Sequence, residues 1–354
     1  MTVSRRRTES GFAHVLIALV VVLIAVLLIV AVMHSESTHS GKTASSQPTR
    51  ARATIDTNAI AHNANPELAS VSATNAASGA IASGSGIVLT SSGQVLTNNH
   101  SIANASSINV SVGTRSYDAR VLGYDAADDL ALLQLTGARG LPAASLAMSP
   151  RVVPGDPVVA LGASAPPQPT FVVALDQTAT SRDGNATRRF GGLLAISAPV
   201  QPGAAGGPLL DRNGKVVGVN LTAASGGSFE QQSANQVGFA IPISDALAVW
   251  QQIASGRGGG NVHVGERAVL GAVTVGSRGG ANVESVTAGG PAARAGIKPG
   301  DTIASINDAT VSSAASLDAA LDPYRPGQTV KVGWVDSANQ FQFAKVTLAA
   351  GAPL

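Results

Sequence analysis

Short stretches in which apolar and polar residues alternate occupy the chain from residue 80 to residue 243, and turns rich in glycine, serine and asparagine separate them. This pattern predicts an all-β unit of small barrels or a sandwich rather than alternating strands and helices. The expected strands cover residues 86–90, 94–97, 108–112, 118–122, 130–135, 157–161, 171–175, 193–196, 215–220 and 237–241. A helical stripe of Leu247, Trp250 and Ile253 follows, with Ser244 as its expected cap.

A glycine-rich run, GRGGGN at residues 256–261, interrupts the chain after this helix. It has almost no side chains to bury and therefore predicts a hinge. About 90 residues follow, with further strands, a helix that starts at Pro291 and a turn at residues 298–301. A segment of that length is large enough to form a separate domain.

Near the N-terminus, 19 consecutive apolar residues run from Val15 to Met33, and three arginines precede them. Such a helix spans about 28 Å, close to the hydrocarbon thickness of a bilayer. We expect a membrane anchor over residues 13–33, a cytoplasmic tail over 1–12 and the bulk of the chain on the extracytoplasmic side. A cleaved signal peptide is the alternative. The polar residues 34–76 predict a flexible stalk.

Composition excludes several function classes. Charged residues make up only 12% of the chain and the net charge is +2, which argues against nucleic-acid binding. The absence of cysteine excludes disulfides, thiolate zinc sites and a cysteine nucleophile. Three histidines of the expected stalk, His34, His39 and His62, have no preorganised spacing for a metal, so we expect neither metal nor cofactor.

One constellation in the β-rich unit points to nucleophilic catalysis. His100 is the only histidine there, and Asp129 opens a strand 29 residues later, with Asp125 and Asp128 as rival acids. A carboxylate that accepts a hydrogen bond from an imidazole fixes the ring so that its other nitrogen can take a proton from a hydroxyl. A third segment, QPGAAGGPLL at residues 201–210, has the small residues that let backbone N–H groups converge on an oxyanion.

Together these segments resemble the HtrA/DegP branch of chymotrypsin-like serine proteases, and among them exported actinobacterial members with one PDZ domain. The resemblance rests on four sequences: GSGIVLTSSGQVLTNNH, DDLALLQL, PGAAGGPLL and VVGVN followed by VGFAIPI. It implies a mainly β, double-barrel protease domain over residues 77–256, a linker over 257–265 and a PDZ domain over 266–354. It also implies catalytic positions at His100, Asp129 and Ala205, with an S1 wall around Leu221, Thr222 and Ala223.

The chain departs from the family at the nucleophile. Active members have serine where this chain has Ala205, and asparagine or aspartate where it has Ala204. A methyl group cannot attack a carbonyl. In this family the nucleophile is exposed by a tight Gly-x-x-Gly turn, which lies here in the segment QPGAAGGPLL and which we call the glycine turn, and neither Ser197 nor Ser225 follows it. The backbone N–H groups of Gly203 and Ala205 remain expected oxyanion donors. The two alanines are either natural or engineered.

Residues 266–350 resemble a PDZ domain through the motif SVTAGGPAARAGIKPGDTIASINDATV. The resemblance implies capture of a peptide as an added strand. It places the terminal carboxylate in a loop of Leu270, Gly271 and Ala272, with Val273 opening the receiving strand. A second helix over residues 313–321 would wall the groove. The alternative is a packing module that closes over the barrel.

Three functions follow from these observations. The first is an inactive, membrane-anchored pseudoprotease that binds extracytoplasmic peptides or unfolded proteins, with an active paralogue or further copies of itself as possible partners. The second is a serine endopeptidase of envelope quality control seen in inactivated form. The third is a structural assembly subunit.

Overall fold

The computed structural model describes residues 56–75, 79–148, 151–183, 186–223, 228–230, 236–277 and 279–351. The chain divides into Met1–Arg52 and one compact unit, Ala53–Leu354, to which all of these residues belong. The expected cytoplasmic tail and membrane anchor lie outside the described residues. Within the described residues, no helix combines the length and the apolar character that crossing a bilayer requires.

The first barrel consists of six antiparallel strands: β1 (Leu68–Thr74), β2 (Ile81–Val88), β3 (Gln94–Thr97), β4 (Ser107–Val112), β5 (Arg115–Asp125) and β6 (Leu130–Leu135). Their order is β5-β4-β1-β2-β3-β6, and pairing between β5 and β6 closes the barrel. Every second side chain points inward, so that Val71, Val110 and Leu133 are fully buried in one apolar cluster. Closure leaves no open edge between these strands.

The expected stalk is wrong for residues 57–74. They form helix α2 (Thr57–Ala64), the 3-10 helix η1 (Asn65–Glu67) and strand β1. β1 lies between β2 and β4 and pairs with both along its length. Its apolar positions are small, Ala69, Val71 and Ala73, so its alternation gives little hydrophobic signal in sequence; the two neighbouring strands are what bury it.

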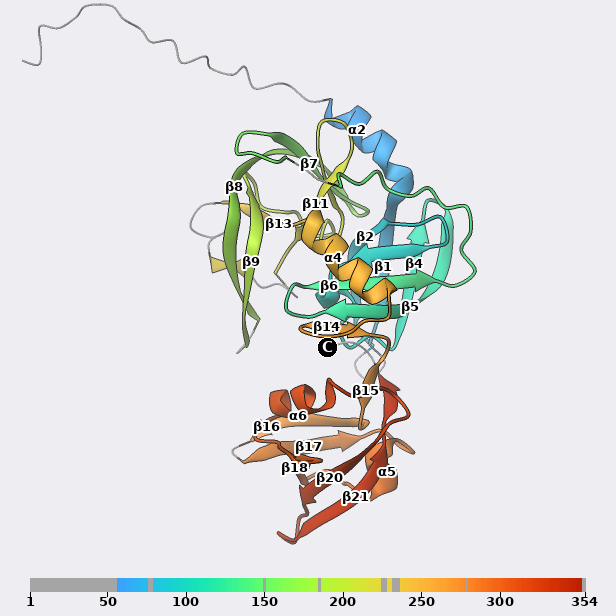
Figure 1. Cartoon of the computed structure of the whole chain (residues 1–354), viewed down its shortest axis with the longest axis vertical. Coiled ribbons are helices and arrows are strands. Elements are labelled where there is room, and N and C mark those ends of the chain that lie inside the picture. The colour runs from blue at the N-terminus through green and yellow to red at the C-terminus, as the bar shows by residue number, and fades with distance from the viewer. Residues whose placement is uncertain are drawn as a thin grey trace, which may run out of the picture. The chain divides into compact units, whose positions relative to one another are not determined.

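The second barrel contains β7 (Pro157–Gly162), β8 (Ala165–Asp183), β9 (Ala186–Ile196), β10 (Pro208–Leu210), β11 (Val216–Leu221), β12 (Ser228–Phe229) and β13 (Gly238–Pro242). Their order is β12-β8-β7-β10-β11-β13-β9, and pairing between β8 and β9 closes the sheet. Figure 1 shows β8 and β9 as a long twisted hairpin. Our strand predictions omitted β10 and β12, because two or three residues are too few to show an alternating pattern.

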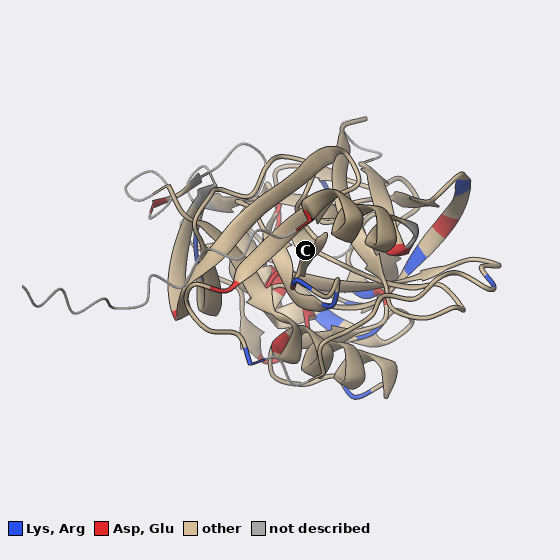
Figure 2. Ribbon diagram, turned by 90° about the horizontal axis from the view of Figure 1, so that it is seen from above, with Lys and Arg blue, Asp and Glu red and all other residues tan. Residues whose placement is uncertain are grey.

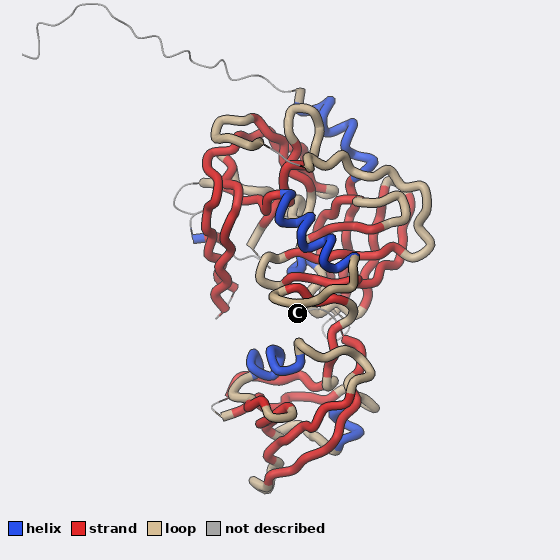
Figure 3. The backbone as a smooth tube through the Cα atoms, in the orientation of Figure 1, coloured by secondary structure: helices blue, strands red, loops and turns tan. Residues whose placement is uncertain are grey.

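Helix α4 (Ile243–Ala254) packs against strands of both barrels, β5 and β6 in the first and β11 and β13 in the second. Figure 3 shows it running across them. Leu247 and Ile253 of the predicted stripe are buried, and the Trp250 indole N–H donates to Gln94 at 2.9 Å. The predicted cap is wrong: Pro242 precedes the helix, and the Ser244 hydroxyl donates to its neighbour Asp245.

The C-terminal domain has two helices and two sheets. Its strands are β15 (Arg267–Val269), β16 (Ala272–Ser277), β17 (Gly280–Val286), β18 (Thr302–Ile306), β19 (Ala309–Thr310), β20 (Thr329–Val335), β21 (Phe341–Thr347) and β22 (Ala349–Gly351). In one sheet β15 pairs with β22, and the other has the order β16-β17-β18-β20-β21 with β19 paired to β18. The helices are α5 (Pro291–Ala295) and α6 (Ala314–Leu321), and a capping box at Ser313 starts α6 close to its predicted position. The end of the expected linker differs from prediction, because strand β14 (Val262–Val264) pairs with β5 of the first barrel.

Charged side chains are sparse and of mixed sign. Figure 2 shows the described ribbon as mostly tan, with short blue and red segments interspersed. Only 12% of the residues are charged.

Tyr124 gives a prediction about alkaline stability. Burial raises its pKa from 10.0 to about 12, and its hydroxyl has no hydrogen-bond partner within the described residues. Between pH 10 and 12 the unfolded phenol ionises while the folded one stays protonated. Stability that is present below pH 10 is therefore lost as the pH rises, by up to about 2.5 kcal/mol.

The measurement is urea unfolding at pH 9 and pH 11.5 for the wild type and for Tyr124→Phe. We expect the phenylalanine variant to lose about 2 kcal/mol less between these two pH values. At neutral pH it should match the wild type to within about 1 kcal/mol, because no hydrogen bond is removed. Equal alkaline losses in the two proteins would contradict the prediction.

Candidate active site

His100 and Asp129 meet at the mouth of the first barrel. His100 lies in the 3-10 helix η2 (Asn99–Ser101), which follows β3, and Asp129 immediately precedes β6. The His100 Nδ1 atom lies 2.6 Å from Asp129 Oδ2, and the His100 backbone N–H donates to Oδ1 at 2.8 Å. Asp129 is fully buried, whereas 14% of the His100 side chain is exposed. The carboxylate thus fixes the ring and leaves Nε2 as the nitrogen available for proton transfer.

The contacts of the three candidate acids distinguish Asp129 from Asp125 and Asp128. The Asp125 carboxylate accepts hydrogen bonds from the backbone N–H groups of Ala127 and Asp128, and so it orders the turn before β6. Asp128 lies on that turn with its side chain partly open to solvent. Partial desolvation of its carboxyl, followed by the nearby Asp125 and Asp245 charges, raises its pKa. Only Asp129 contacts the imidazole among these three acids.

The glycine turn is closed by a hydrogen bond from Ala204 N–H to the Gln201 carbonyl at 3.0 Å. Pro202 and Gly203 are its central residues, and Gly203 has a φ of 85°, which is the pattern of a type II turn. Ser85 of β2 holds the turn twice. Its hydroxyl donates to the Gly203 carbonyl at 2.6 Å, and its backbone N–H donates to the Ala205 carbonyl at 2.8 Å.

These bonds bring the turn against the His100 segment. A Cβ placed on Gly206 would lie 2.7 Å from the Thr97 hydroxyl and 2.9 Å from the Asn98 nitrogen, two residues before His100. The structure therefore assembles the three segments that the sequence analysis singled out. At the expected nucleophile position, Ala205 carries a methyl group and is 5% exposed.

The N–H groups of Gly203 and Ala205 are unpaired. Neither donates a hydrogen bond within the described part of the chain, whereas the neighbouring N–H groups of Ala204, Gly206 and Gly207 all do. Two free N–H groups that flank one residue of a tight turn can receive a developing oxyanion. The expected oxyanion donors are therefore available, although the nucleophile position has no hydroxyl.

Ala204 lies in an apolar environment. It is 2% exposed and belongs to a cluster with Val158, Val172 and Leu209. Gly162 approaches it so closely that a Cβ on that glycine would lie 2.8 Å from the Ala204 Cβ. A polar side chain at position 204 would have to be buried in this cluster, and burying an unpaired amide or carboxylate is unfavourable.

Other hydroxyl groups do not replace the missing one. Ser197 is exposed, and its hydroxyl pairs with Thr170 at 3.0 Å and accepts from the Phe171 backbone. Ser225 lies outside the described residues. Ser101 was not among the expected site residues. It is 2% exposed, and its hydroxyl has no partner in the described structure. A Cβ on Gly84 would lie 2.7 Å from its Oγ atom, so the hydroxyl is packed against β2 and closed to solvent.

The expected S1 wall lies at the end of β11. Leu221 is buried, and Thr222 and Ala223 are half-buried. Asn220, just before them, accepts from the Gly206 N–H through its carbonyl and donates its amide to the carbonyls of Leu161 and Pro208. The side chains of Leu221, Thr222 and Ala223 are uncharged and follow directly after the residue that contacts the glycine turn. A substrate side chain that entered here would meet no charge from these three residues.

In the C-terminal domain, the expected carboxylate loop precedes the edge strand β16. Leu270 is buried, and its carbonyl accepts from Ala292 at the start of α5. The Gly271 carbonyl accepts from Thr287. Val273 and Val275 of β16 are 51% and 46% exposed, and β16 pairs with β17 on one side only. An extended chain can therefore add to its free edge.

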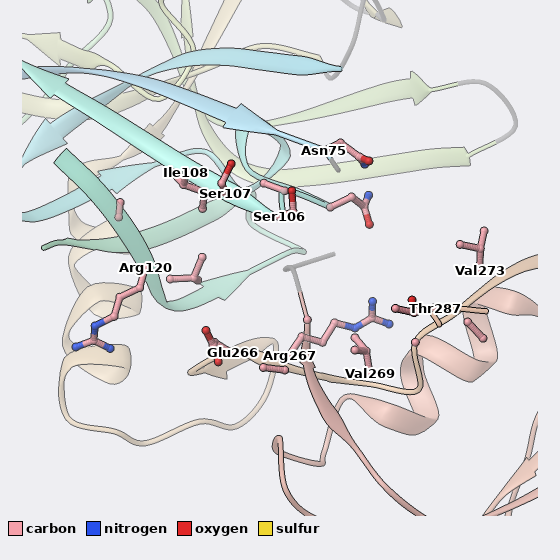
Figure 4. A pocket seen from close by; sticks show the side chains of 18 residues that line it. Asn75, Ser106, Ser107, Ile108, Arg120, Glu266, Arg267, Val269, Val273 and Thr287 are labelled. Carbon is pink, nitrogen blue, oxygen red and sulfur yellow. The ribbon is translucent and has the colours of Figure 1, made fainter. Parts of the chain in front are cut away.

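A cavity of about 780 Å³ adjoins this loop. Gly271 and Ala272 of the loop belong to its lining, and Figure 4 labels Val269, Val273 and Thr287 among the other lining residues. Arg267 lies in its lining, is 8% exposed and pairs with Asp318 of α6, while its Nε–H has no partner among the described residues. Arg267 was not among the expected site residues, and a cationic residue in an otherwise apolar stretch, RAVLGAV, was the available signal.

Among the described residues, no group of three histidine or carboxylate side chains is placed to hold an ion. His34 and His39 lie outside these residues. His62, on α2, is part of no such group.

Comparisons with known proteins find one matching family for each of these two domains. Residues 84–219 match the family described as a trypsin-like peptidase domain, and residues 268–335 match the PDZ domain family. The chain is 32% identical over 254 residues to the periplasmic serine endoprotease DegP of Salmonella typhimurium, covering 66% of this chain and 50% of that protein. It is 31% identical over 236 residues to the serine protease PepD of Mycobacterium tuberculosis, covering 64% and 50%.

The chain thus spans about half the length of these curated relatives. Among solved structures, it is similar to the serine endoprotease from Yersinia pestis, with 26% sequence identity and a TM-score of 0.47 over 84% of this chain and 98% of that one.

Proposed function

The chain belongs to the HtrA-like proteins, which join a trypsin-like peptidase domain to a PDZ domain, and from this premise we propose that it binds peptides or unfolded polypeptides without cutting them. One observation carries the proposal. The His100–Asp129 pair is intact, and the N–H groups of Gly203 and Ala205 donate no hydrogen bond within the described residues, but position 205 has a methyl group instead of a hydroxyl. Without a nucleophile the acyl transfer cannot begin.

The surroundings of Ala204 support a natural rather than an engineered origin of the alanine pair. A single change from serine to alanine at position 205 would inactivate the enzyme and leave the preceding residue as it was. Here the preceding residue is also alanine, and it packs into an apolar cluster against the closely approaching Gly162. This environment suits an alanine and would leave an asparagine or aspartate side chain without an evident partner.

The competing proposal is a serine endopeptidase of envelope quality control that is recorded here in inactivated form. The intact His100–Asp129 contact favours it, because no catalytic demand preserves such a pair in an inactive protein. The residue encoded at position 205 in the gene decides between the two proposals. A serine codon there would establish the second.

The class of peptide ligand is inferred from the free edge of β16 and the loop that precedes it. The free edge of β16 supplies backbone groups for an added strand, and the loop of Leu270, Gly271 and Ala272 at its start would receive a terminal carboxylate. We therefore propose peptides with a free C-terminus as ligands of the C-terminal domain. A structural assembly role is the alternative if no peptide binds.

Binding without cleavage is tested by incubating the full chain with fluorescent C-terminal peptides and with unfolded casein, and measuring anisotropy and fragment formation together. We expect the chain to bind the peptides and to produce no fragments. Amidation of the peptide carboxylate should weaken the affinity by about tenfold or more, because a charge-assisted hydrogen bond is lost. Val273→Asp should weaken binding by about tenfold as well, since it places a like charge beside the carboxylate.

Val173→Asp is the matched control, because Val173 is exposed to a similar extent but lies on β8 of the second barrel. We expect it to leave peptide affinity unchanged. Equal affinities for free and amidated peptides would contradict carboxylate capture. Fragments that accumulate with the wild type and disappear in His100→Ala would contradict the inactive site.

For its location, we propose a single-pass membrane protein, anchored by residues 13–33 with the N-terminus in the cytoplasm. The apolar run from Val15 to Met33 and the three preceding arginines support this topology. Extraction of isolated membranes with alkaline carbonate tests it. We expect the full-length chain to remain in the pellet; a shortened, soluble product would indicate a cleaved signal peptide instead.

A further inference from the structure

The outer face of the β20–β21 hairpin carries an unusual group of side chains. Phe341 and Phe343 are 50% and 58% exposed, although the other described phenylalanines are buried or half-buried. Their rings meet edge to face at 5.0 Å. Lys331 lies with its ammonium 4.3 Å from the centre of the Phe343 ring, and Lys345 pairs directly opposite Lys331. Two of the seven phenylalanines and two of the five lysines of the chain are thus on one face.

The sheet register explains why these residues share a face. In a strand, alternate side chains point to opposite sides. Val330, Val332, Trp334 and Val346 fill the core of the domain. The residues between them therefore point outward, and Gly333, opposite Phe343, leaves the space that the Phe341 ring enters, since a Cβ there would lie 3.1 Å from that ring.

We propose that this face, which we call the FK face and define as Lys331, Phe341, Phe343 and Lys345, docks the C-terminal domain onto an anionic membrane surface. Exposed aromatic rings that enter the interfacial region, together with lysines that reach acidic headgroups, are the combination that holds amphipathic protein surfaces on such membranes. The proposal rests in part on the proposed anchor at residues 13–33, which would bring the domain near a bilayer.

Charge distinguishes a membrane from a second copy of the chain. Among the outward residues of β20 and β21, there are two lysines and no acid. A two-fold contact would place the same face on both copies and bring four ammonium groups together, which is unfavourable. Asp336 lies at the turn beyond Phe341, where hydrogen bonds from Gln340 and then Gln342 lower the pKa of its carboxyl and turn it onto the loop.

The shape of the face also suits a lipid surface. Two cavities among the described residues, of about 780 Å³ and about 250 Å³, include no residue of the FK face. The two exposed rings lie on the outer face of a sheet. A bilayer interface accepts protruding aromatic rings without a complementary shape.

The test uses the full chain reconstituted in lipid nanodiscs. Because the protein has no cysteine, Thr347→Cys, on the outward side of β21, gives one site for an environment-sensitive dye. We expect a blue shift and quenching by spin-labelled lipid in discs with one part phosphatidylglycerol to two of phosphatidylcholine, and neither effect with phosphatidylcholine alone. High salt should remove the effect.

Variants separate the contributions. Lys331→Gln with Lys345→Gln should lower the ratio of docked to undocked domains by about thirtyfold, from the contribution of each lysine near an anionic surface. Phe341→Ser with Phe343→Ser should abolish the quenching. The matched control, Val173→Ser with Leu175→Ser, removes a similarly exposed apolar pair from β8 and should change nothing.

Three results would overturn the proposal: no shift in anionic discs, equal shifts in both lipids, or equal losses in the FK face and β8 variants. A shift that appears only on adding polyglutamate would assign the face to an acidic protein instead. Co-elution of the chain with the discs reports separately on the anchor. If the chain elutes free of discs, the anchor proposal fails, and anionic vesicles added from outside must still shift the dye for docking to stand.

Discussion

Replacing Ala205 with serine converts the protein into an active endopeptidase, with a rate of casein cleavage on the order of 10⁴-fold to 10⁶-fold above the wild-type background, the range by which loss of the serine lowers the activity of triad enzymes. The reason is that the other requirements are in place. Asp129 holds His100 through a 2.6 Å contact, and the N–H groups of Gly203 and Ala205 are free. A hydroxyl at position 205 supplies the one missing group.

The measurement combines fragment formation from casein with labelling by a fluorophosphonate probe, which reacts with activated serines. We expect Ala205→Ser to be labelled and the wild type to remain unlabelled. The double variant Ala205→Ser, His100→Ala removes the base and should lose the label. Ala204→Ser is the matched control, because it adds the same hydroxyl one residue earlier, where the side chain is buried in an apolar cluster.

Two outcomes would contradict this expectation. Labelling of the wild type would mean that another hydroxyl acts as nucleophile. A folded Ala205→Ser protein that is neither labelled nor active would mean that the dyad and the glycine turn do not form a working site, and that more than one oxygen atom separates this chain from activity.

Replacing Gly206 with alanine should have the largest effect on stability among single changes at the site. Gly206 has a φ of 78°, and an added Cβ would lie 2.4 Å from the Ser85 carbonyl oxygen and 2.9 Å from the Asn98 nitrogen. Both of these atoms belong to the backbone of the first barrel and cannot turn aside. We expect the free energy of unfolding to fall by about 4 kcal/mol or more. Losses of this size are rare for single substitutions and arise when a change forces packed backbone apart.

Gly214→Ala isolates the cost of backbone conformation. Gly214 has a φ of 74°, nearly the same as Gly206, but nothing lies within 4 Å of the position that its Cβ would take. We expect a loss of about 1 kcal/mol there. Urea unfolding of both variants gives the difference, which reports on the contact between the glycine turn and the first barrel. Similar losses in the two variants would show that this contact contributes little to stability.

The same substitution tests the assembly of the site. In the background of Ala205→Ser, Gly206→Ala should abolish fluorophosphonate labelling, whereas Gly214→Ala should preserve it. Displacement of the turn moves the hydroxyl and the two N–H groups away from His100, and an error of about 1 Å in such an arrangement is enough to reduce rates by about 10².

Strand predictions from sequence located most strands of the two barrels, but not always their bounds. β3 and β6 have the predicted bounds, whereas β8 and β9 extend six to eight residues beyond the predicted ranges 171–175 and 193–196. β1 was missed because its inward residues are alanines and one valine, which resemble a polar linker until β2 and β4 cover them. The Ser244 cap was wrong because the local sequence favours a serine cap, while Pro242 at the end of β13 already starts the helix.

The sequence alone determined what chemistry is missing, because the identity of the side chain at position 205 is local information, and the spacing of the three segments pointed to the site around it. The folded structure was needed to establish which aspartate contacts His100 and that the N–H groups of Gly203 and Ala205 are unpaired within the described residues. It was also needed to show that Ala204 is buried, and that Phe341 and Phe343 share an exposed face with two lysines. Each of these depends on partners supplied by strands far away in the chain, and burial and hydrogen bonding in a sheet are set by those partners rather than by neighbours in sequence.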